Sequence, residues 1–426
     1  MGKKRQVRER DISKEPRSIV GMDAHTKKLA LSVWDWRDRF NPVVRQEFRC
    51  VGIEDMEAVY KRHVSTDSLT IIEATMNAGE LKRRLEAIGY AAEIVRSDTL
   101  KGKERRRKVC DIQDARNLAL AYIHGNVDGF VLAPTGQTSE RRDLLAAYQE
   151  AVKETTRLAN RMWSLCIEKG VKAPKGKGKP RVDRLLAAVA EAGIGGMAKT
   201  RFEMLGEDYL RMFERRERLY RQIAETVATT PVMRALMQLP GVGCVAAFAL
   251  VAAVGDIRRF ATSAKLAAYG GFSPVLDTTG DEEERAKKRG GTGKPLDGEG
   301  RSEIKTFFTE AGQTVMKSLP KTPLGKWGWA MFHRGKPWNK VVCAIGRKLL
   351  NYAWHIMRGD PTPNRHDEAF FARKMMALHS DVGAKRMYEL GFGTRKDFAQ
   401  LACGDIYGAL PPINADPINP NNEKIS

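Results

Sequence analysis

The first part of the chain has the apolar pattern of three successive strands. SIVGMD, from residue 18, is a short apolar run that ends in an acid, and LALSVWDW, from residue 29, alternates apolar and polar positions. VVRQEFR, from residue 43, follows a turn signal at Asn41 and Pro42. Three consecutive strands predict an antiparallel meander at the start of a sheet.

After this meander the pattern changes to strands separated by helices. Residues 69–74 (LTIIEA) and 91–96 (AAEIVR) are apolar enough for buried strands. Helical spacing of apolar residues is found over 53–63, 78–88 and 111–125. The alternation predicts an α/β or mixed sheet with helices packed on it, and Pro134 and Gly136 mark the end of this domain.

The middle of the chain predicts long charged helices. A helical pattern covers residues 139–169, a basic Gly/Pro linker (KAPKGKGKPRVDR) covers 172–184, and helical spacing returns over 182–228. Two charged helices around a flexible linker are typical of a coiled-coil arm, which mediates self-association or spans between domains.

Small apolar residues dominate after Pro231. The segment LMQLPGVGCVAAFALVAAVG (236–255) predicts a helix, a tight turn and a second helix. Gly241 and Gly243 permit that turn and would let backbone N–H groups approach a phosphate, as in a helix-hairpin-helix element. A glycine turn between two packed helices is the alternative, and the following Arg258 and Arg259 favour DNA.

These patterns, with helices also predicted over 302–316 and 338–357, divide the chain into five segments. They are a flexible basic arm (1–17), an α/β domain (18–135), a helical coiled-coil arm (136–230) with its basic linker at 170–184, a mainly α domain (231–360), and a separate extension (361–426) with a Pro/Asn-rich, disordered end.

Charge narrows the class of partner. The chain has 73 Lys and Arg against 52 Asp and Glu, a formal charge of +21, so a polyanion is expected, and nucleic acid is the commonest one.

No apolar run is long enough to span a membrane, no secretory signal is seen, and six scattered cysteines suit a reduced, cytoplasmic protein without zinc. Basic loops at 101–108, 172–184 and 285–301 suit phosphate backbones. In the first of them, the expected nucleic-acid-binding residues are Lys101, Lys103, Arg105, Arg106, Arg107 and Lys108.

Four acids of the α/β domain are candidates for a metal site. Asp23 ends the first strand, Glu73 ends the buried strand, and Asp111 and Asp114 lie three residues apart at a helix start. Converging carboxylates repel unless divalent cations neutralise them, and Mg²⁺ prefers oxygen ligands and suits phosphate chemistry. Each acid alone is explained as a strand-end or helix N-cap group. Together, beside a basic loop, they favour the Mg²⁺ site.

The same residues carry a family resemblance. GMD at 21–23, IIEAT at 71–75 and CDIQDARNLA at 110–119 resemble the acidic motifs of the DEDD transposases of the IS110 type. Four further motifs resemble the C-terminal domain of that family and occur in the same order: PGVG (240–243), GDIRRF (255–260), LAAYGGFSP (266–274) and VVCAIGRKLLNYAWHIM (341–357). Relatives of this family include bridge-RNA-guided recombinases and pilin-gene invertases.

The resemblance implies a complete mechanism. The first domain would be RuvC-like (RNase H-like), with Asp23, Glu73, Asp111 and Asp114 holding Mg²⁺. The coiled coil would build a dimer, and two dimers a synaptic tetramer. The C-terminal domain would supply a serine that attacks a DNA phosphate, while a structured guide RNA pairs with DNA and carries the sequence specificity.

One departure concerns the nucleophile. In that family the serine lies five residues after the proline of the motif seen here as GFSP, in a Ser-Gly pair, and here that position is Thr279, followed by Gly280. A threonine can act as nucleophile when it is activated, although its β-methyl crowds an in-line approach. Other nearby hydroxyls are Ser273, Thr278 and Ser302.

Three functions therefore remain open on the sequence. The first is an RNA-guided DNA recombinase of a mobile element, in the bacterial cytoplasm. The second is a metal-dependent DNA junction nuclease that uses the four acids alone. The third is a non-catalytic descendant that binds nucleic acid. Because all four acids are present, simple decay to the third is disfavoured.

Overall fold

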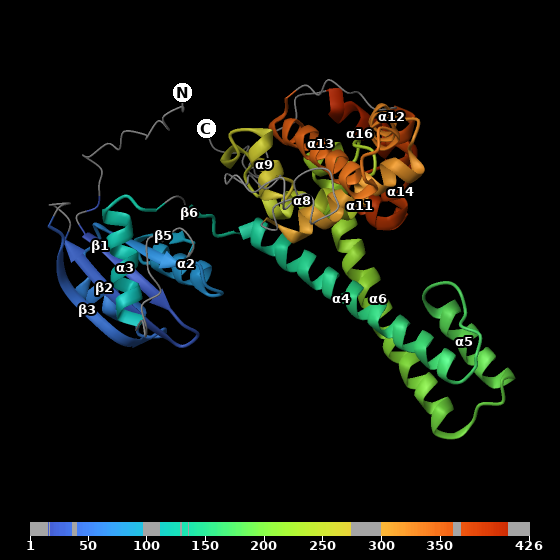
Figure 1. Cartoon of the computed structure of the whole chain (residues 1–426), viewed down its shortest axis with the longest axis horizontal. Coiled ribbons are helices and arrows are strands. Elements are labelled where there is room, and N and C mark those ends of the chain that lie inside the picture. The colour runs from blue at the N-terminus through green and yellow to red at the C-terminus, as the bar shows by residue number, and fades with distance from the viewer. Residues whose placement is uncertain are drawn as a thin grey trace. The chain divides into compact units, whose positions relative to one another are not determined.

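A computed structural model describes most of the chain. It covers Pro16 and residues 18–35, 41–96, 111–127, 130–134, 136–273, 300–360 and 368–407. The chain forms two compact units, Met1–Thr135 and Gly136–Ser426, coloured blue to cyan and cyan to red in Figure 1. Several predicted features lie outside the described ranges: the basic arm apart from Pro16, the basic loop 101–108, residues 285–299 of the third basic loop, Thr278 and Thr279, and the Pro/Asn-rich end after residue 407.

The first unit is built on one six-stranded mixed sheet of order β3-β2-β1-β4-β5-β6. Its strands are β1 (Ser18–Ala24), β2 (Lys28–Asp35), β3 (Val43–Gly52), β4 (Ser68–Glu73), β5 (Ala91–Val95) and β6 (Phe130–Val131). The first three form the predicted antiparallel meander, and β4 runs parallel to both β1 and β5. The mixed α/β character of this unit is confirmed.

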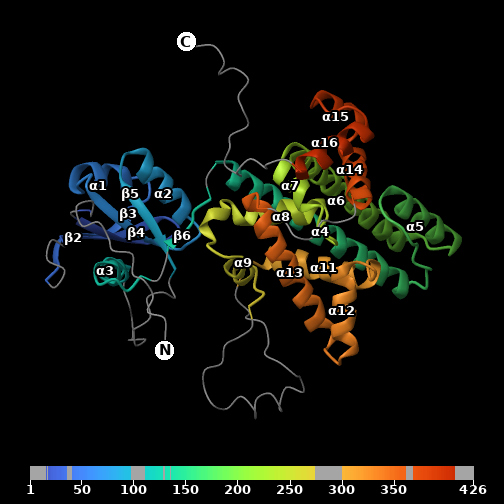
Figure 2. The ribbon, with the colours of Figure 1, turned by 90° about the horizontal axis from the view of Figure 1, so that it is seen from above.

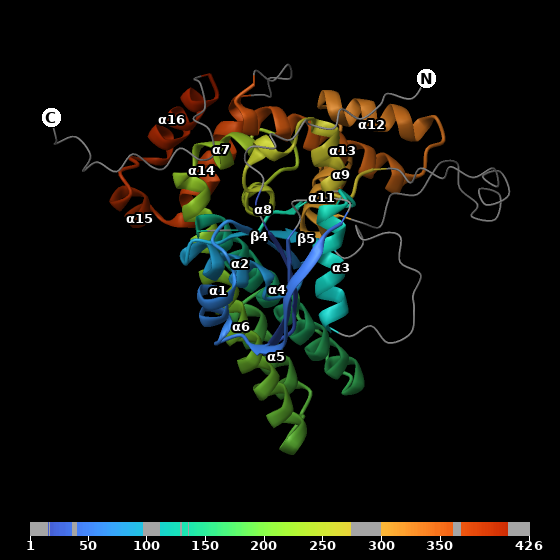
Figure 3. The same cartoon turned by 90° about the vertical axis from the view of Figure 1, so that its left-hand side faces the viewer.

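Helices cover both faces of this sheet. They are α1 (Met56–His63), α2 (Ala78–Ala87) and α3 (Asp111–Ile123), and Figure 3 shows α3 on one face with α1 and α2 on the other. Successive side chains of a strand point to opposite faces of the sheet, so β1 contributes to the hydrophobic core on each face. Val20 and Met22 pack with α1 and α2, whereas Ile19 packs with α3. Gly21 and Asp23 have the parity of Ile19 and so lie on the α3 face.

The second unit begins with a helical arm. Two long helices, α4 (Gly136–Glu168) and α6 (Gly196–Thr229), lie side by side (Figure 1), and α5 (Lys179–Glu191) joins them. Leu158 and Met162 of α4 share a core with Phe202 of α6, whereas the other ends of both helices enter the larger core of the unit. The two helices therefore run antiparallel.

The predicted linker is shorter than expected. Residues 179–184 are the first half of α5, because Pro180 occupies the first helical turn, where its fixed φ and missing N–H are tolerated. Val182 and Leu185 then bury against α6, so this stretch is a docked helix. A break at 192–195 also divides the helix predicted over 182–228 into α5 and α6.

The remainder of the second unit is helical, as predicted. Its elements are α7 (Pro231–Leu236), α8 (Cys244–Val254), η3 (Ile257–Arg259), α9 (Ser263–Tyr269), α11 (Ser302–Ser318), α12 (Pro323–His333), α13 (Trp338–Arg358), α14 (Glu368–Val382), α15 (Ala384–Glu389) and α16 (Arg395–Tyr407). Every residue of α8 except Val245 is buried, so this helix is the centre of the core. No helix within the described ranges has the length and apolarity that crossing a membrane requires.

The interpretation of residues 361–426 as a separate extension is wrong for its described part. Phe371, Met375 and Leu378 of α14 and Phe398 of α16 belong to the same buried cluster as α8. These residues repeat every three or four positions, which places them on one helix face. Helices α14 and α16 therefore complete the core of this unit.

Candidate functional site

Asp23 and Glu73 lie at the same edge of the sheet. β1 and β4 are parallel, and Met22 is opposite Ile72 in their register. The next residue on each strand is an acid, so Asp23 and Glu73 end neighbouring strands side by side. Asp23 is only 6% exposed, whereas Glu73 is partly exposed.

Helix α3 brings Asp111 and Asp114 to this edge. It can lie close to β1 because residue 21 is glycine: a Cβ there would be 1.8 Å from the carbonyl oxygen of Ala115. A glycine within a strand often marks such a close backbone approach. Gly21 and Asp23 share a strand face, so the contact at Gly21 sets the first turn of α3 over the Asp23 carboxylate.

A second contact holds α3 in place. Arg116 donates to both carboxylate oxygens of Glu47 on β3, with its Nη2 2.6 Å from Oε2. The Arg116 guanidinium also holds the pKa of Glu47 below its ordinary value. Bidentate pairs of this kind fix orientation as well as distance. Glu47 and Arg116 are thus positioning residues, and the sequence analysis did not identify them.

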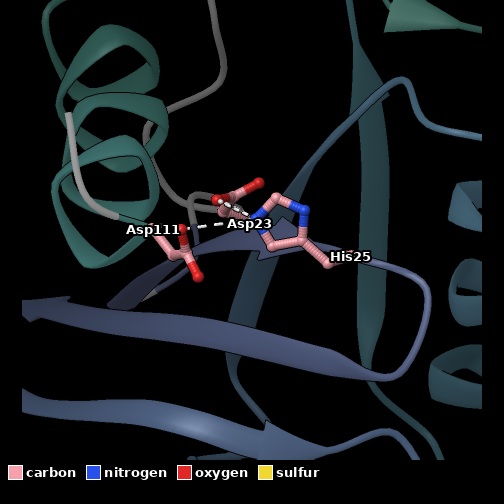
Figure 4. Close-up of side chains that lie close together, drawn as sticks. All are labelled: Asp23, His25 and Asp111. Carbon is pink, nitrogen blue, oxygen red and sulfur yellow. Dashed lines mark ion pairs between the residues drawn. The ribbon is translucent and has the colours of Figure 1, made fainter. Parts of the chain in front are cut away.

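His25 is a further residue of the site that the sequence analysis missed. Its Nε2 lies 3.5 Å from Asp23 Oδ2 and 3.4 Å from Asp111 Oδ1, so the imidazole stands between the two carboxylates (Figure 4). The loop that carries it is fixed by Asn77, whose side-chain amide donates to the His25 carbonyl oxygen at 3.0 Å. The available signal was its spacing, two residues after Asp23 in GMDAH.

The four acids are close enough to perturb one another. Burial is the largest cause that raises the pKa of Asp23; His25 lowers it, the charges of Glu73, Asp114 and Asp111 raise it, and the net pKa is about 6. The predicted acids, which are up to 91 residues apart in sequence, are thus brought together around Asp23. A buried carboxylate among like charges is stabilised by a bound cation.

The donor set fits a divalent cation. One ligand atom each from Asp23, His25 and Asp111 lie within 4.8 Å of one another. Carboxylate oxygens suit Mg²⁺ and Mn²⁺, whereas an imidazole nitrogen suits Mn²⁺ better than Mg²⁺. The side chain of His25 is 59% exposed and that of Asp111 is 58% exposed, so both can adjust to an incoming ion.

The predicted hairpin glycines have different surroundings. A Cβ on Gly241, whose φ is +77°, would be 2.4 Å from the carbonyl oxygen of Ala311 on α11, so packing alone requires glycine there. Gly243 is exposed at the N-cap of α8, and a Cβ there would meet nothing within 4 Å. The N–H groups that would meet a phosphate are therefore those at Gly243 and the following turn.

This hairpin turn is fixed by a lysine from α14. Lys374 Nζ donates to the carbonyl oxygens of Met237, Leu239 and Val242 at 2.7, 2.9 and 2.8 Å. Burial lowers the pKa of Lys374 to about 7, but only the ammonium form has three hydrogens for three acceptors. Lys374 therefore ties the C-terminal helices to the turn.

Lys374→Met is expected to destabilise the protein by about 3 kcal/mol, because three buried carbonyl groups lose a charged donor. The midpoint of urea unfolding measures the loss. Lys396→Met, at an exposed position on α16, is the matched control and should leave that midpoint within experimental error. An unchanged midpoint for Lys374→Met would contradict this role.

The predicted arginines lie at the C-terminus of α8. Arg259 donates to the carbonyl oxygen of Val254 at 3.1 Å and stacks on Phe260, which accounts for it as a helix cap. Arg258 pairs with Asp256 at 2.8 Å, and its side chain is 71% exposed. Arg258 is therefore the more accessible of the two to a phosphate.

Of the candidate nucleophiles, Ser273 and Ser302 are described. They border the segment 274–299, which contains Thr279. The two borders are held together, since Arg301 N donates to the Tyr269 carbonyl oxygen at 2.8 Å. Ser302 is exposed, with its Oγ 3.4 Å from a carboxylate oxygen of Glu303.

Comparisons with known proteins agree with the sequence motifs. Residues 233–322 match the family described as "Transposase IS116/IS110/IS902 family". A "Putative transposase y4pF/y4sB" of Sinorhizobium fredii is 23% identical over 79% of this chain and 83% of its own length. The "Transposase for insertion sequence element IS1111A" of Coxiella burnetii is 25% identical over 79% of this chain and 93% of its own. A "Probable family 20 transposase" of Pseudomonas aeruginosa is 24% identical over 68% and 83%. These matches confirm the predicted resemblance: the chain is similar to the IS110-type transposases.

Proposed function

We propose that this chain is a transposase that cuts and rejoins DNA of a mobile element. The observation that carries the proposal is the convergence of Asp23, Glu73, Asp111 and Asp114 at one sheet edge, where the charges of the other three raise the pKa of Asp23. The similarity to proteins named as transposases supports DNA as the substrate.

In this proposal the first unit is a RuvC-like domain whose acids hold Mg²⁺. A bound Mg²⁺ supplies Lewis-acid polarisation of a phosphate oxygen and orients it. The chain itself holds the acids in place through Gly21, Glu47 and Arg116. His25 occupies the space between Asp23 and Asp111 and, when protonated, offsets part of their charge.

The second unit would supply the hydroxyl nucleophile and the surface through which copies of the chain assemble. Thr279 takes the place of the family's serine, and its segment starts and ends at adjacent points of the core. The arm of α4, α5 and α6 would pair copies of the chain into a dimer and a tetramer. Its exposed apolar residues support this role: Trp163, Ile167, Met197 and Met204. A structured guide RNA would pair with the DNA.

The test is a denaturing gel of protein, Mg²⁺, element-end DNA and co-purified RNA. Wild type is expected to form a covalent protein–DNA adduct, and Thr279→Ala to lose it. An adduct that survives in Thr279→Ala moves the nucleophile to another hydroxyl. Cleaved ends without any adduct favour the junction nuclease, and bound but intact DNA favours a binding protein without catalysis.

Asp111→Asn is expected to reduce adduct and cleavage by about 100-fold or more, because the first turn of α3 then offers one carboxylate fewer to the cation. Retention of DNA binding in a gel-shift assay shows that the variant is folded. Asp183→Asn, on α5 in the other unit, is the matched control. Wild-type cleavage by Asp111→Asn would contradict the metal site.

A further inference from the structure

The segment from α11 to the end of α13 has charge of one sign. Between Ala311 and Gly359 the sequence has nine Lys or Arg and no Asp or Glu. In a chain with 52 acids in 426 residues, 49 residues without one are unusual. A run of this kind would repel itself unless a polyanion lies against it.

Aromatic side chains gather where α12 ends and α13 begins. Trp329 is in edge-to-face contact with both Phe332 and Trp338, at centroid distances of 5.6 and 6.0 Å. Phe332 and Trp338 are themselves edge-to-face at 5.7 Å, and His333 lies 5.6 Å from Trp329. These residues, together with Arg334 and Lys336, form what we call the α12–α13 tip; Figure 2 shows these helices as neighbours in the helical unit.

The aromatic cluster is anchored on one side and open on the other. Trp329 Nε1 donates to the Met316 carbonyl oxygen at 3.1 Å, and Trp329 and Trp338 pack against the main core. Phe332 is 37% exposed and does not belong to that core. The cluster therefore holds the exposed ring of Phe332 rigidly at the surface.

Cations surround this cluster. The two cations are Arg334 and Lys336, which are both exposed, and no carboxylate pairs with either of them within the described parts of the chain. The turn that carries them is compact, because Gly335 adopts φ +83° and Pro337 precedes α13. Aromatic faces beside unpaired cations are the two elements of a single-strand binding surface: bases stack on the rings and phosphates meet the cations.

We propose that the α12–α13 tip binds single-stranded DNA by stacking an unpaired base on the exposed ring of Phe332, which Trp338 supports edge to face. The phosphates on either side of that base meet Arg334 and Lys336. The choice of DNA over RNA rests on the proposed function, since strands separate when a transposase cuts and exchanges DNA. The stacking itself rests on the geometry of the tip alone.

The test measures base stacking apart from charge. Binding of the full chain to fluorescein-labelled oligo(dT) of 20 nucleotides is measured by anisotropy, in EDTA so that no cleavage occurs. An abasic strand of the same length carries the same phosphates without bases. Wild type is expected to bind oligo(dT) about 5- to 100-fold more tightly than the abasic strand, the range of one stacked base.

Phe332→Ala is expected to bring that ratio close to one, with the affinity for the abasic strand unchanged. Phe332→Tyr keeps the ring and should keep the ratio. Tyr388→Ala removes an aromatic ring of α15 that is 80% exposed outside the tip and should leave both affinities unchanged. The double variant Arg334→Ala, Lys336→Ala should lower the slope of log affinity against log salt by about 1.4.

The outcomes separate the two proposals. A wild-type ratio in Phe332→Ala, or an equal loss on both strands, overturns the stacking site while leaving the transposase proposal intact. An effect seen on oligo(U) and absent on oligo(dT) overturns DNA as the occupant. Failure of wild type to bind any strand or a DNA duplex contradicts the proposed function as well.

Discussion

Asp23→Asn is expected to abolish DNA cleavage, by about 1,000-fold or more, while making the metal-free protein more stable at pH 7. Activity falls because the most buried acid of the site loses its charge and its preferred metal-ligand oxygen. Stability rises because the same charge is buried beside three other acids. An effect of opposite sign on activity and stability is the signature of a functional site and is not produced by a general packing defect.

The pH dependence of stability follows from the raised pKa. The folded chain holds the Asp23 proton up to about pH 6, whereas the unfolded chain releases it near the ordinary aspartate pKa of 3.8. Between these values the folded state binds more protons, so this group makes the metal-free protein less stable as the pH rises, by up to about 3 kcal/mol. Above pH 6 that cost is fully present, and below pH 4 it is absent.

Thermal unfolding in EDTA from pH 4 to pH 7 measures this effect. The melting temperature of Asp23→Asn should exceed that of wild type by an amount that grows across this window. Mg²⁺ should raise the melting temperature of wild type and leave that of Asp23→Asn nearly unchanged. Asp55→Asn, at an exposed acid that makes no side-chain cap on α1, is the matched control. If Asp23→Asn lowers stability at pH 7, the repulsion argument fails.

The four acids of this site could be predicted from the sequence, whereas His25, which lies between two of them, could not. Asp23 and Glu73 each end an apolar run, and strands of a parallel pair end at the same edge, so their proximity followed from the pattern. His25 lies in the three-residue loop between β1 and β2, which has no periodicity, and its position depends on the side chain of Asn77, far away in sequence. Tertiary contacts of this kind leave no local signal.

The helices that were missed have a similar explanation. α12 contains Gly325 and Gly328, which lower helix propensity, yet both are buried against neighbouring elements where a Cβ would clash. α14 and α16 have weak amphipathicity and follow a proline-containing stretch, which favoured the prediction of a separate tail. Their burial depends on contacts with α6 and α7, more than 100 residues earlier in the chain, and on the hydrogen bonds of Lys374.

Gly21→Ala is expected to reduce both stability and cleavage, because it separates α3 from β1. The new Cβ would be 1.8 Å from the Ala115 carbonyl oxygen, so the helix or the strand must move by more than about 1 Å, at a cost of about 3 kcal/mol. The obstacle is backbone, so no change of side chain on α3 can relieve it. The displacement also carries Asp111 and Asp114 away from Asp23, and with them one side of the metal site.

The measurement combines unfolding with metal titration. Gly21→Ala should lower the midpoint of urea unfolding and weaken the stabilisation by Mg²⁺, in contrast to Asp23→Asn, which raises stability in EDTA. Gly79→Ala is the matched control: its Cβ would lie 3.8 Å from the Ala133 Cβ, an ordinary contact, and alanine in α2 should stabilise by about 1 kcal/mol or less. Wild-type stability in Gly21→Ala would mean that α3 is free to move on the sheet. The four acids would then be held together by the cation, and the close approach at Gly21 would not be what aligns them.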